Sequence, residues 1–157
     1  MIWHVAFAVD NLEEGMEQFG KALNLDWTPI KNYTGPNSHA DGTPFELTTR
    51  LTFATAGPCA LELFEAVKDT PNEPAQGTVF HHMGYWTSDV ATEKDRLAQC
   101  NWQHAGGYTS PDTRAAFFSS TLGIFLEACN VTINRPNLEK YYPGEGTGIQ
   151  VPDQLAQ

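Results

Sequence analysis

The sequence predicts an α+β fold in which two tandem βαβββ modules form a cupped, barrel-like mixed sheet with helices outside. Three observations predict it: a repeat spanning about half the chain, an alternating apolar strand followed by an amphipathic helix in each copy, and strand-like segments after each helix. The copies begin at His4, with HVAFAVDNLEEGMEQFGKAL, and at His82, with HMGYWTSDVATEKDRLAQC, 78 residues apart in a chain of 157.

Each copy contains one amphipathic helix. The apolar residues of the first recur at helical spacing: Leu12, Met16, Phe19 and Leu23. Asn11 and Glu14 form a capping box at its start. In the second copy Val90 and Leu97 take the matching apolar positions, after a polar cap expected at Ser88.

Strand-like segments follow each helix, and short turns join the last two segments of each half. The expected strands are 27–33, 46–55 and 59–66 in the first half, and 103–109, 115–120 and 123–129 in the second. We therefore expect one module at 1–66, a linker rich in Pro and Gly at 67–78, a second module at 79–130 and an irregular C-terminal tail at 131–157.

Composition excludes several classes of partner. The net charge is −10, from 9 Lys and Arg against 19 Asp and Glu, and no basic stripe is present for nucleic acid or an anionic membrane. No apolar run approaches the roughly 20 residues that span a bilayer, and no secretory signal is recognisable at the N-terminus. A cytoplasmic protein is expected. The three cysteines are widely spaced without a CxxC pair, which favours free buried thiols.

Two histidines lie on strand faces with small neighbours. Alternation places Val5, Phe7 and Val9 toward the helix, and His4 on the opposite face with two alanines. His82 shares a face with Gly84 in the same way. Small residues beside a histidine indicate a face that lines a cavity. The same alternation assigns His81 to the helix side.

Two glutamates lie among apolar residues in the last strand of each half. Glu62 is flanked by two leucines, and Glu127 by Leu126 and Ala128. A buried carboxylate is unfavourable unless it is paired or bound to a cation. Two imidazoles and two carboxylates suit one divalent first-row metal ion: Zn, Ni, Co, Mn or Fe. The alternative is that each histidine is a satisfied strand residue and each glutamate an exposed edge residue.

These segments resemble the vicinal-oxygen-chelate superfamily, which includes glyoxalase I, methylmalonyl-CoA epimerase, extradiol dioxygenases and bleomycin or fosfomycin resistance proteins. The resemblance covers residues 2–130, and its carriers are HVAF from His4, LELFE around Glu62, FHHM around His82 and GIFLE ending at Glu127. It implies that ligands come from the first and last strand of each module. The resemblance thereby joins His4, Glu62, His82 and Glu127 into one metal site. Within the superfamily, the sequence is most similar to the glyoxalase–epimerase branch.

The implied activity is that of a metal-dependent lyase or isomerase/epimerase. Such an enzyme removes a proton next to a metal-bound carbonyl of a small carbonyl compound or acyl thioester. Glu127 is expected to be both ligand and base, and Glu46 a second acid or base. Ala8 stands where glyoxalase I usually has an arginine for glutathione, so glutathione conjugates are disfavoured. A non-heme iron dioxygenase, or a non-catalytic binding protein of the resistance type, is the alternative.

Alternation in the third strand predicts pocket residues. With Leu47, Leu51 and Phe53 assigned to the helix side, the opposite set would face the cup. Arg50 is then a candidate for a substrate carboxylate or carbonyl, although an exposed arginine is an equal alternative. The substrate-binding candidates are Arg50, Thr52, Phe64, Trp86 and Phe117.

Further expectations concern the periphery of the fold and its assembly. The extra length of the first module, at 34–44, contains Gly, Pro and Asn and is expected to be a loop, either a lid over the cup or a surface excursion. His39 and His104 are expected at the surface or rim. Exposed strand edges favour a homodimer, and the sequence leaves open whether the site closes within one chain or between two.

Overall fold

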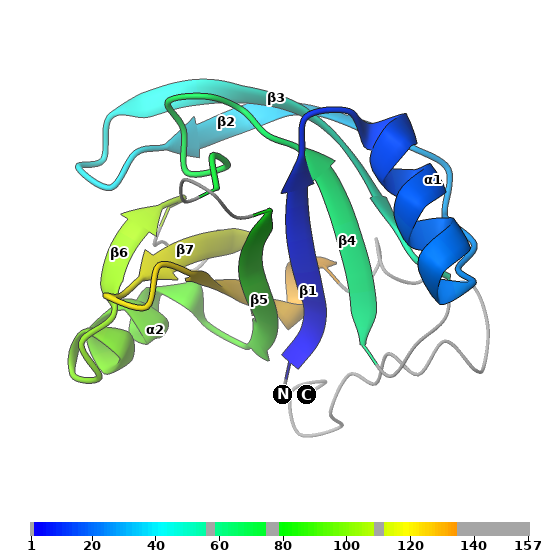
Figure 1. Cartoon of the computed structure of the whole chain (residues 1–157). Helices are drawn as coiled ribbons and strands as arrows, with labels where there is room; N and C mark the ends of the chain where they lie inside the picture. The colour runs from blue at the N-terminus through cyan, green and yellow to red at the C-terminus, as the bar shows by residue number, and fades with distance from the viewer. Residues whose placement is uncertain (1, 56–58, 75–78, 109–111, 135–157) are drawn as a thin grey trace.

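The computed structural model describes residues 2–55, 59–74, 79–108 and 112–134. Its strands form one eight-stranded mixed sheet in the order β2-β3-β4-β1-β5-β8-β7-β6 (Figure 1). The elements are β1 Ile2–Val9, α1 Leu12–Leu23, β2 Lys31–Ser38, β3 Pro44–Phe53, β4 Ala60–Glu65, β5 Phe80–Thr87, α2 Val90–Ala98, β6 Gln103–Gly106, β7 Ala115–Ser119 and β8 Phe125–Asn130. The two βαβββ modules join along β1 and β5, which pair antiparallel, and the predicted fold class is confirmed.

The helices begin where polar caps precede apolar residues, and they lie outside the curved sheet (Figure 1). The Asn11 side chain accepts a hydrogen bond from the Glu14 backbone N–H at 2.9 Å, as predicted. On the inner face of α1 the ring of Phe19 lies 5.1 Å from that of Phe7. The cap of α2 is Asp89, one residue beyond the predicted Ser88, and its carboxylate accepts from the Ala91 N–H at 2.8 Å.

The loop expected at 34–44, either a lid or a surface excursion, is instead mostly part of a long hairpin. β2 starts at Lys31 rather than at 27 and continues to Ser38, pairing in register with β3 as far as Pro44. Only residues 39–43 form the turn, where Gly42 has a φ of 86°. Turn-forming residues such as Pro36 led the sequence interpretation to a loop here. Proline is nevertheless tolerated in β2, because an edge strand need not donate hydrogen bonds on both sides.

The two edge strands of the sheet meet at one end of the cup. His39, just after β2, forms a bridge with Gly106 at the end of β6. The Gly107 N–H donates to the Ser38 carbonyl at 2.9 Å, and the Tyr108 hydroxyl donates to the Asn37 carbonyl at 3.0 Å. The sheet therefore curls toward closure within a single chain.

Segments outside the sheet support the cup. Pro71, in the predicted linker, packs so closely on Gly106 that a Cβ there would lie 2.3 Å from its Cγ. The predicted tail begins with a helical turn at 131–134, capped by Asn130, whose side chain accepts from the Thr132 N–H at 3.0 Å. Residues 75–78 of the linker and 135–157 of the tail lie outside the described residues. No helix in the described ranges is long and apolar enough to cross a membrane.

Candidate metal centre

Four side chains from the four central strands converge on one point. His4 on β1 and His82 on β5 place their Nε2 atoms 2.7 Å apart. Glu127 Oε2 on β8 lies 3.2 Å from His4 Nε2 and 3.5 Å from His82 Nε2. Glu62 Oε2 on β4 lies 3.3 Å from His4 Nε2 and 3.9 Å from His82 Nε2. The structure thus brings together the four residues that alternation and repetition indicated.

The register of the central strands creates the space for this cluster. His4 is opposite Gly84 in the β1–β5 pair. A Cβ on Gly84 would lie 1.8 Å from His4 Cε1, so only glycine leaves room for the ring. The Trp3 ring packs edge-on against His4, with centroids 3.9 Å apart. Packing fixes this imidazole, because its buried Nδ1 has no hydrogen-bond partner among the described residues.

The electrostatics of the cluster favour a bound cation. Burial lowers the pKa of His4 to about 4, so the imidazole is neutral near pH 7. Burial, together with the nearby Glu127 carboxylate, raises the pKa of Glu62 well above its usual value. Burial also acts to raise the pKa of Glu127, but interactions with the His4 and His82 rings outweigh it and hold this pKa well below its usual range. Two buried carboxylates so close together repel each other unless a proton or cation lies between them.

The donor set fits one divalent ion. A first-row metal with ligands at about 2.1 Å places neighbouring donor atoms about 3 Å apart, and the separations here run from 2.7 to 3.9 Å. Imidazole nitrogens and carboxylate oxygens are ligands that these metals accept. His4, Glu62 and His82 are buried and the Glu127 side chain is only 17% exposed, which limits competition from bulk water.

His81 lies on the cavity side, so its predicted position against the helix is wrong. The β1–β5 register shifts between Ala6, opposite His82, and Phe7, opposite Phe80, which leaves His81 as the extra residue of a bulge. Its ring is buried and stacks on Phe125 with centroids 4.8 Å apart. A local bulge breaks the alternation on which the prediction rested.

His81 and a backbone carbonyl orient His82. The Pro71 carbonyl only accepts, so His81 Nε2, 2.9 Å away, carries the proton. Burial, together with the neighbouring His82, lowers the pKa of His81 to about 3, so its ring is neutral and Nδ1 is an acceptor. His82 Nδ1 then donates to His81 Nδ1 across 2.8 Å. His82 Nε2 keeps a free lone pair directed at the other donors, the arrangement typical of a metal-ligating histidine.

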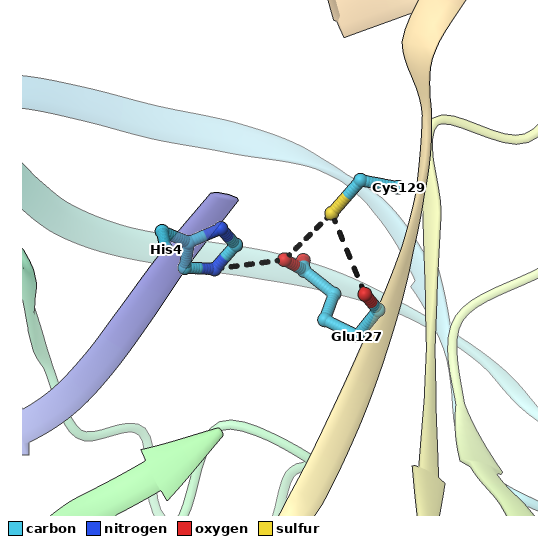
Figure 2. A group of neighbouring side chains, drawn as sticks. All are labelled: His4, Glu127 and Cys129. Carbon is cyan, nitrogen blue, oxygen red and sulfur yellow. Dashed lines mark hydrogen bonds and ion pairs between the residues drawn. The ribbon is translucent and has the colours of Figure 1, made fainter. Parts of the chain in front are cut away.

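Cys129 belongs to the same cluster and was missed by the sequence interpretation. Its Sγ lies 3.0 Å from Glu127 Oε2, and one donor atom each of His4, Glu127 and Cys129 lie within 4.8 Å of one another (Figure 2). Burial, with the Glu127 carboxylate, raises the pKa of this thiol well above its usual value, so it is a neutral S–H donor to Glu127. The signal was present in the sequence, because Cys129 follows Glu127 by two residues and shares its strand face.

Glu62, His82 and Glu127 line a cavity of about 180 Å³. Phe64 and Phe117 line it as predicted, whereas Trp86 does not and instead stacks on Trp3 with centroids 4.6 Å apart. The lining residues that the sequence interpretation missed include Trp3, Lys31, Thr49, Asn72, Arg114 and Cys129.

The predicted orientation of β3 is wrong. Leu47, Thr49, Leu51 and Phe53 line the cavity, so the opposite set faces outward. Arg50 Nη1 donates to Glu65 Oε1 at 2.9 Å and its guanidinium also pairs with Glu13 of α1. The Thr52 hydroxyl donates to the Thr28 carbonyl at 2.8 Å, and Glu46 is exposed outside the cavity lining. The apolar face of this strand packs into the cup, and its polar face meets the helix through ion pairs.

The two peripheral histidines follow the expectation in part. His39 lies beside the turn of the β2–β3 hairpin, at the end of the cup where the edge strands meet. His104 is half-buried on β6, and its Nε2 donates to the Gly107 carbonyl at 2.7 Å. Neither residue lines the cavity that borders the metal cluster.

Three solved structures share this fold. The first is a hypothetical protein from Bacillus halodurans C-125, with 17% identity and a TM-score of 0.57 over 82% of this chain and 92% of that one. A substituted Streptomyces coelicolor methylmalonyl-CoA epimerase in complex with 2-nitronate-propionyl-CoA has 14% identity and a TM-score of 0.54, over 82% of this chain and 92% of that one. The Mycobacterium tuberculosis methylmalonyl-CoA epimerase has 14% identity and a TM-score of 0.52, over 82% of this chain and 85% of that one. At these identities the similarity concerns the fold.

Sequence comparison identifies the family. A comparison with curated proteins found no significant match. A family model described as the Glyoxalase/Bleomycin resistance protein/Dioxygenase superfamily matches residues 3–117, more than half of the chain. The matched segment includes His4, Glu62 and His82, and Glu127 follows it. The chain therefore belongs to this superfamily, whose members are also called vicinal-oxygen-chelate proteins.

Proposed function

We propose that this protein is a divalent-metal-dependent lyase or isomerase/epimerase that removes a proton next to the carbonyl of a small carbonyl compound or acyl thioester. The observation that carries the proposal is the convergence of two imidazoles and two carboxylates, one pair from each module, beside a cavity. Similarity to methylmalonyl-CoA epimerases in fold supports it at the level of the superfamily.

His4, Glu62, His82 and Glu127 would hold the ion. A divalent ion bound there would act as a Lewis acid on the substrate carbonyl and stabilise the negative charge that develops when the neighbouring proton leaves. His81 and the Pro71 carbonyl keep the His82 lone pair directed at that position.

Glu127 is the proposed base. Its carboxylate is ionised near pH 7, since interactions with the two histidine rings outweigh burial and hold its pKa low, and it borders the cavity where a substrate would lie. Burial and Glu127 raise the pKa of Glu62 in the metal-free protein, so this carboxylate must release its proton when it binds the ion. The apolar walls around Phe64 and Phe117 exclude water from this proton transfer.

Metal content and hydrogen exchange test the proposal together. We expect protein purified without chelator to hold about one equivalent of a first-row divalent ion, which dialysis against a chelator removes. In deuterium oxide, the holoprotein should exchange the acidic carbon-bound hydrogen of a small ketone or thioester substrate, followed by NMR. Glu127→Gln should lower that exchange by at least about a hundredfold.

The matched control is Glu46→Gln, which changes an exposed carboxylate on β3 and should leave exchange unaltered. Absence of metal uptake on titration would refute the proposal. Oxygen consumption with an aromatic diol would favour the dioxygenase alternative instead. Tight ligand binding without any exchange in a panel of ketones and thioesters would indicate a sequestering protein.

A further inference from the structure

Two cations line the cavity although the whole chain has a net charge of −10. They are Lys31 of β2 and Arg114, just before β7. Lys31 is opposite Leu51 in the β2–β3 register, and Arg114 directly precedes Ala115. Leu51 and Ala115 pack on the same cluster of buried residues around Trp3. Each module thus contributes one cation to the lining, next to a residue that packs on this cluster.

Arg114 differs from the other two arginines in the described part of the chain. Arg50 pairs with Glu13 and Glu65, and Arg96 pairs with Glu93. For Arg114 the described residues provide no carboxylate within ion-pair distance. A half-buried guanidinium that lines a cavity without a carboxylate partner is suited to an anionic ligand, because its planar fork binds a carboxylate through two hydrogen bonds.

The backbone of Arg114 is held in place. Its carbonyl accepts from the Asn130 N–H at 2.8 Å and from Asn134 Nδ2 at 2.9 Å. Arg114 also lies close to the metal cluster along the strands, since its neighbour Ala115 is opposite Cys129, whose Sγ is 3.0 Å from Glu127 Oε2. A ligand bound to the metal cluster can therefore extend toward Arg114 within one cavity.

A buried amide elsewhere in the lining supports a polar ligand. Asn72, in the linker, is only 8% exposed, and its Oδ1 has no hydrogen-bond partner among the described residues. An amide oxygen buried without a partner is destabilising unless a ligand or water satisfies it. The rest of the wall is largely apolar and aromatic, including Leu47, Phe53 and Phe64.

The geometry points to a carboxylate subsite at Arg114, with Lys31 in the same cavity lining, so that the substrate is a small carbonyl compound bearing a carboxylate. This inference rests on the proposed function for its carbonyl end, and it replaces Arg50, which faces away from the cavity. Arg114 is thus a specificity-determining residue that binds the non-reacting end of the substrate.

Binding of two matched probes tests the subsite. 4-Oxopentanoate and 4-oxopentanamide have the same shape and differ in the charge at one end. We expect the metal-loaded protein to bind the carboxylate at least about tenfold more tightly than the amide, measured by calorimetry and by fluorescence of the cavity-lining Trp3. Arg114→Gln should remove this preference, and Arg114→Lys should keep part of it. Arg96→Gln, an arginine outside the cavity, should change nothing.

The outcomes separate this inference from the proposed function. Equal affinity of the wild-type protein for the two probes, or a preference retained in Arg114→Gln, would overturn the subsite while metal binding and hydrogen exchange stood. Loss of metal binding in Arg114→Gln would also overturn it, because the residue would then act on the metal cluster rather than on the ligand. Displacement of the probe by inorganic phosphate at a lower concentration than by acetate would overturn the carboxylate assignment in favour of phosphate.

Discussion

His82 illustrates how single atoms prepare the candidate metal centre. Its ligand atom, Nε2, is free because the proton on Nδ1 is donated to His81, which donates in turn to the Pro71 carbonyl. Histidine ligands need such partners to fix their tautomer, and loss of the partner typically weakens metal binding. His4 has no such partner among the described residues, and the Trp3 ring and the space at Gly84 hold it instead. The two imidazoles are therefore positioned by different means.

Replacing His81 should weaken metal binding although His81 is not itself a ligand. His81→Leu removes the acceptor of the His82 Nδ1 proton, and we expect a 10- to 100-fold rise in the metal Kd, measured by competition with a chromophoric chelator. His81→Gln, which retains an acceptor, should recover part of the affinity. His104→Leu is the matched control, because it removes a similar hydrogen bond from a histidine ring to a carbonyl, at Gly107. An equal effect of His81→Leu and His104→Leu would rule out the orienting role.

The buried histidines also predict how metal-free protein responds to acid. The pKa of His4 is lowered to about 4, mainly by burial, so the unfolded state binds a proton at higher pH than the folded state does. The His4 contribution to the free energy of unfolding is therefore fully present above about pH 6.5 and falls by roughly 3 kcal/mol as the pH drops toward 4, whereas Glu62, whose pKa is raised, contributes in the opposite direction. Urea unfolding of the wild-type protein and of His4→Gln at several pH values isolates the His4 contribution, and His4→Gln should lose less stability on acidification. An equal loss in the two proteins would contradict it.

At the scale of elements, the close contact of β1 and β5 makes the site possible. These central strands carry one ligand each, and their parallel partners β4 and β8 carry the other two. The outer strand β3 carries no candidate ligand, so the site depends on the central strands. Arg50 of β3 links α1 to β4 through Glu13 and Glu65 on the convex side, and exposed ion pairs of this kind contribute little each.

Gly84→Ala should damage the site more than the fold. The added Cβ would lie 1.8 Å from His4 Cε1, so the ring must move away from the other donors. We expect a metal Kd at least about tenfold higher and a loss of about 1–3 kcal/mol in the free energy of unfolding. Gly15→Ala, on α1, is the matched control, because its added Cβ would lie 3.3 Å from the Val9 side chain, a much less severe contact. Unchanged metal affinity in Gly84→Ala would show that His4 is not held by this contact.

At the scale of the whole molecule, one chain supplies the complete candidate site. All four candidate ligands come from the same sheet, and its edges meet at His39 and Gly106. This arrangement favours a site within one chain over a site shared between two chains, the alternative that the sequence left open. A homodimer remains a prediction, and light scattering would test it against the 17.3 kDa of a single chain.

Mixed variants should fail to complement each other. His4→Ala and His82→Ala each remove a ligand from the same site, so unfolding and refolding them together should restore no metal binding. If the site were shared between chains, about half of the chains would pair as mixed dimers, and each of these would regain one intact site. Metal titration of the refolded mixture, compared with refolded wild-type protein, measures the outcome. Recovery of binding would contradict a site within one chain.

The sequence by itself determined the fold class and the four converging residues, because the repeat and the alternation of strand faces are local properties that survive folding. It could not determine which face of β3 lines the cup, so Arg50, Thr52 and Glu46 were assigned to the wrong side. Alternation separates two faces, but only the curvature of the assembled sheet decides which of them is concave. The bulge at His81 and the cavity at Arg114 likewise arise from pairing between distant strands. Only the tertiary structure could therefore place those side chains.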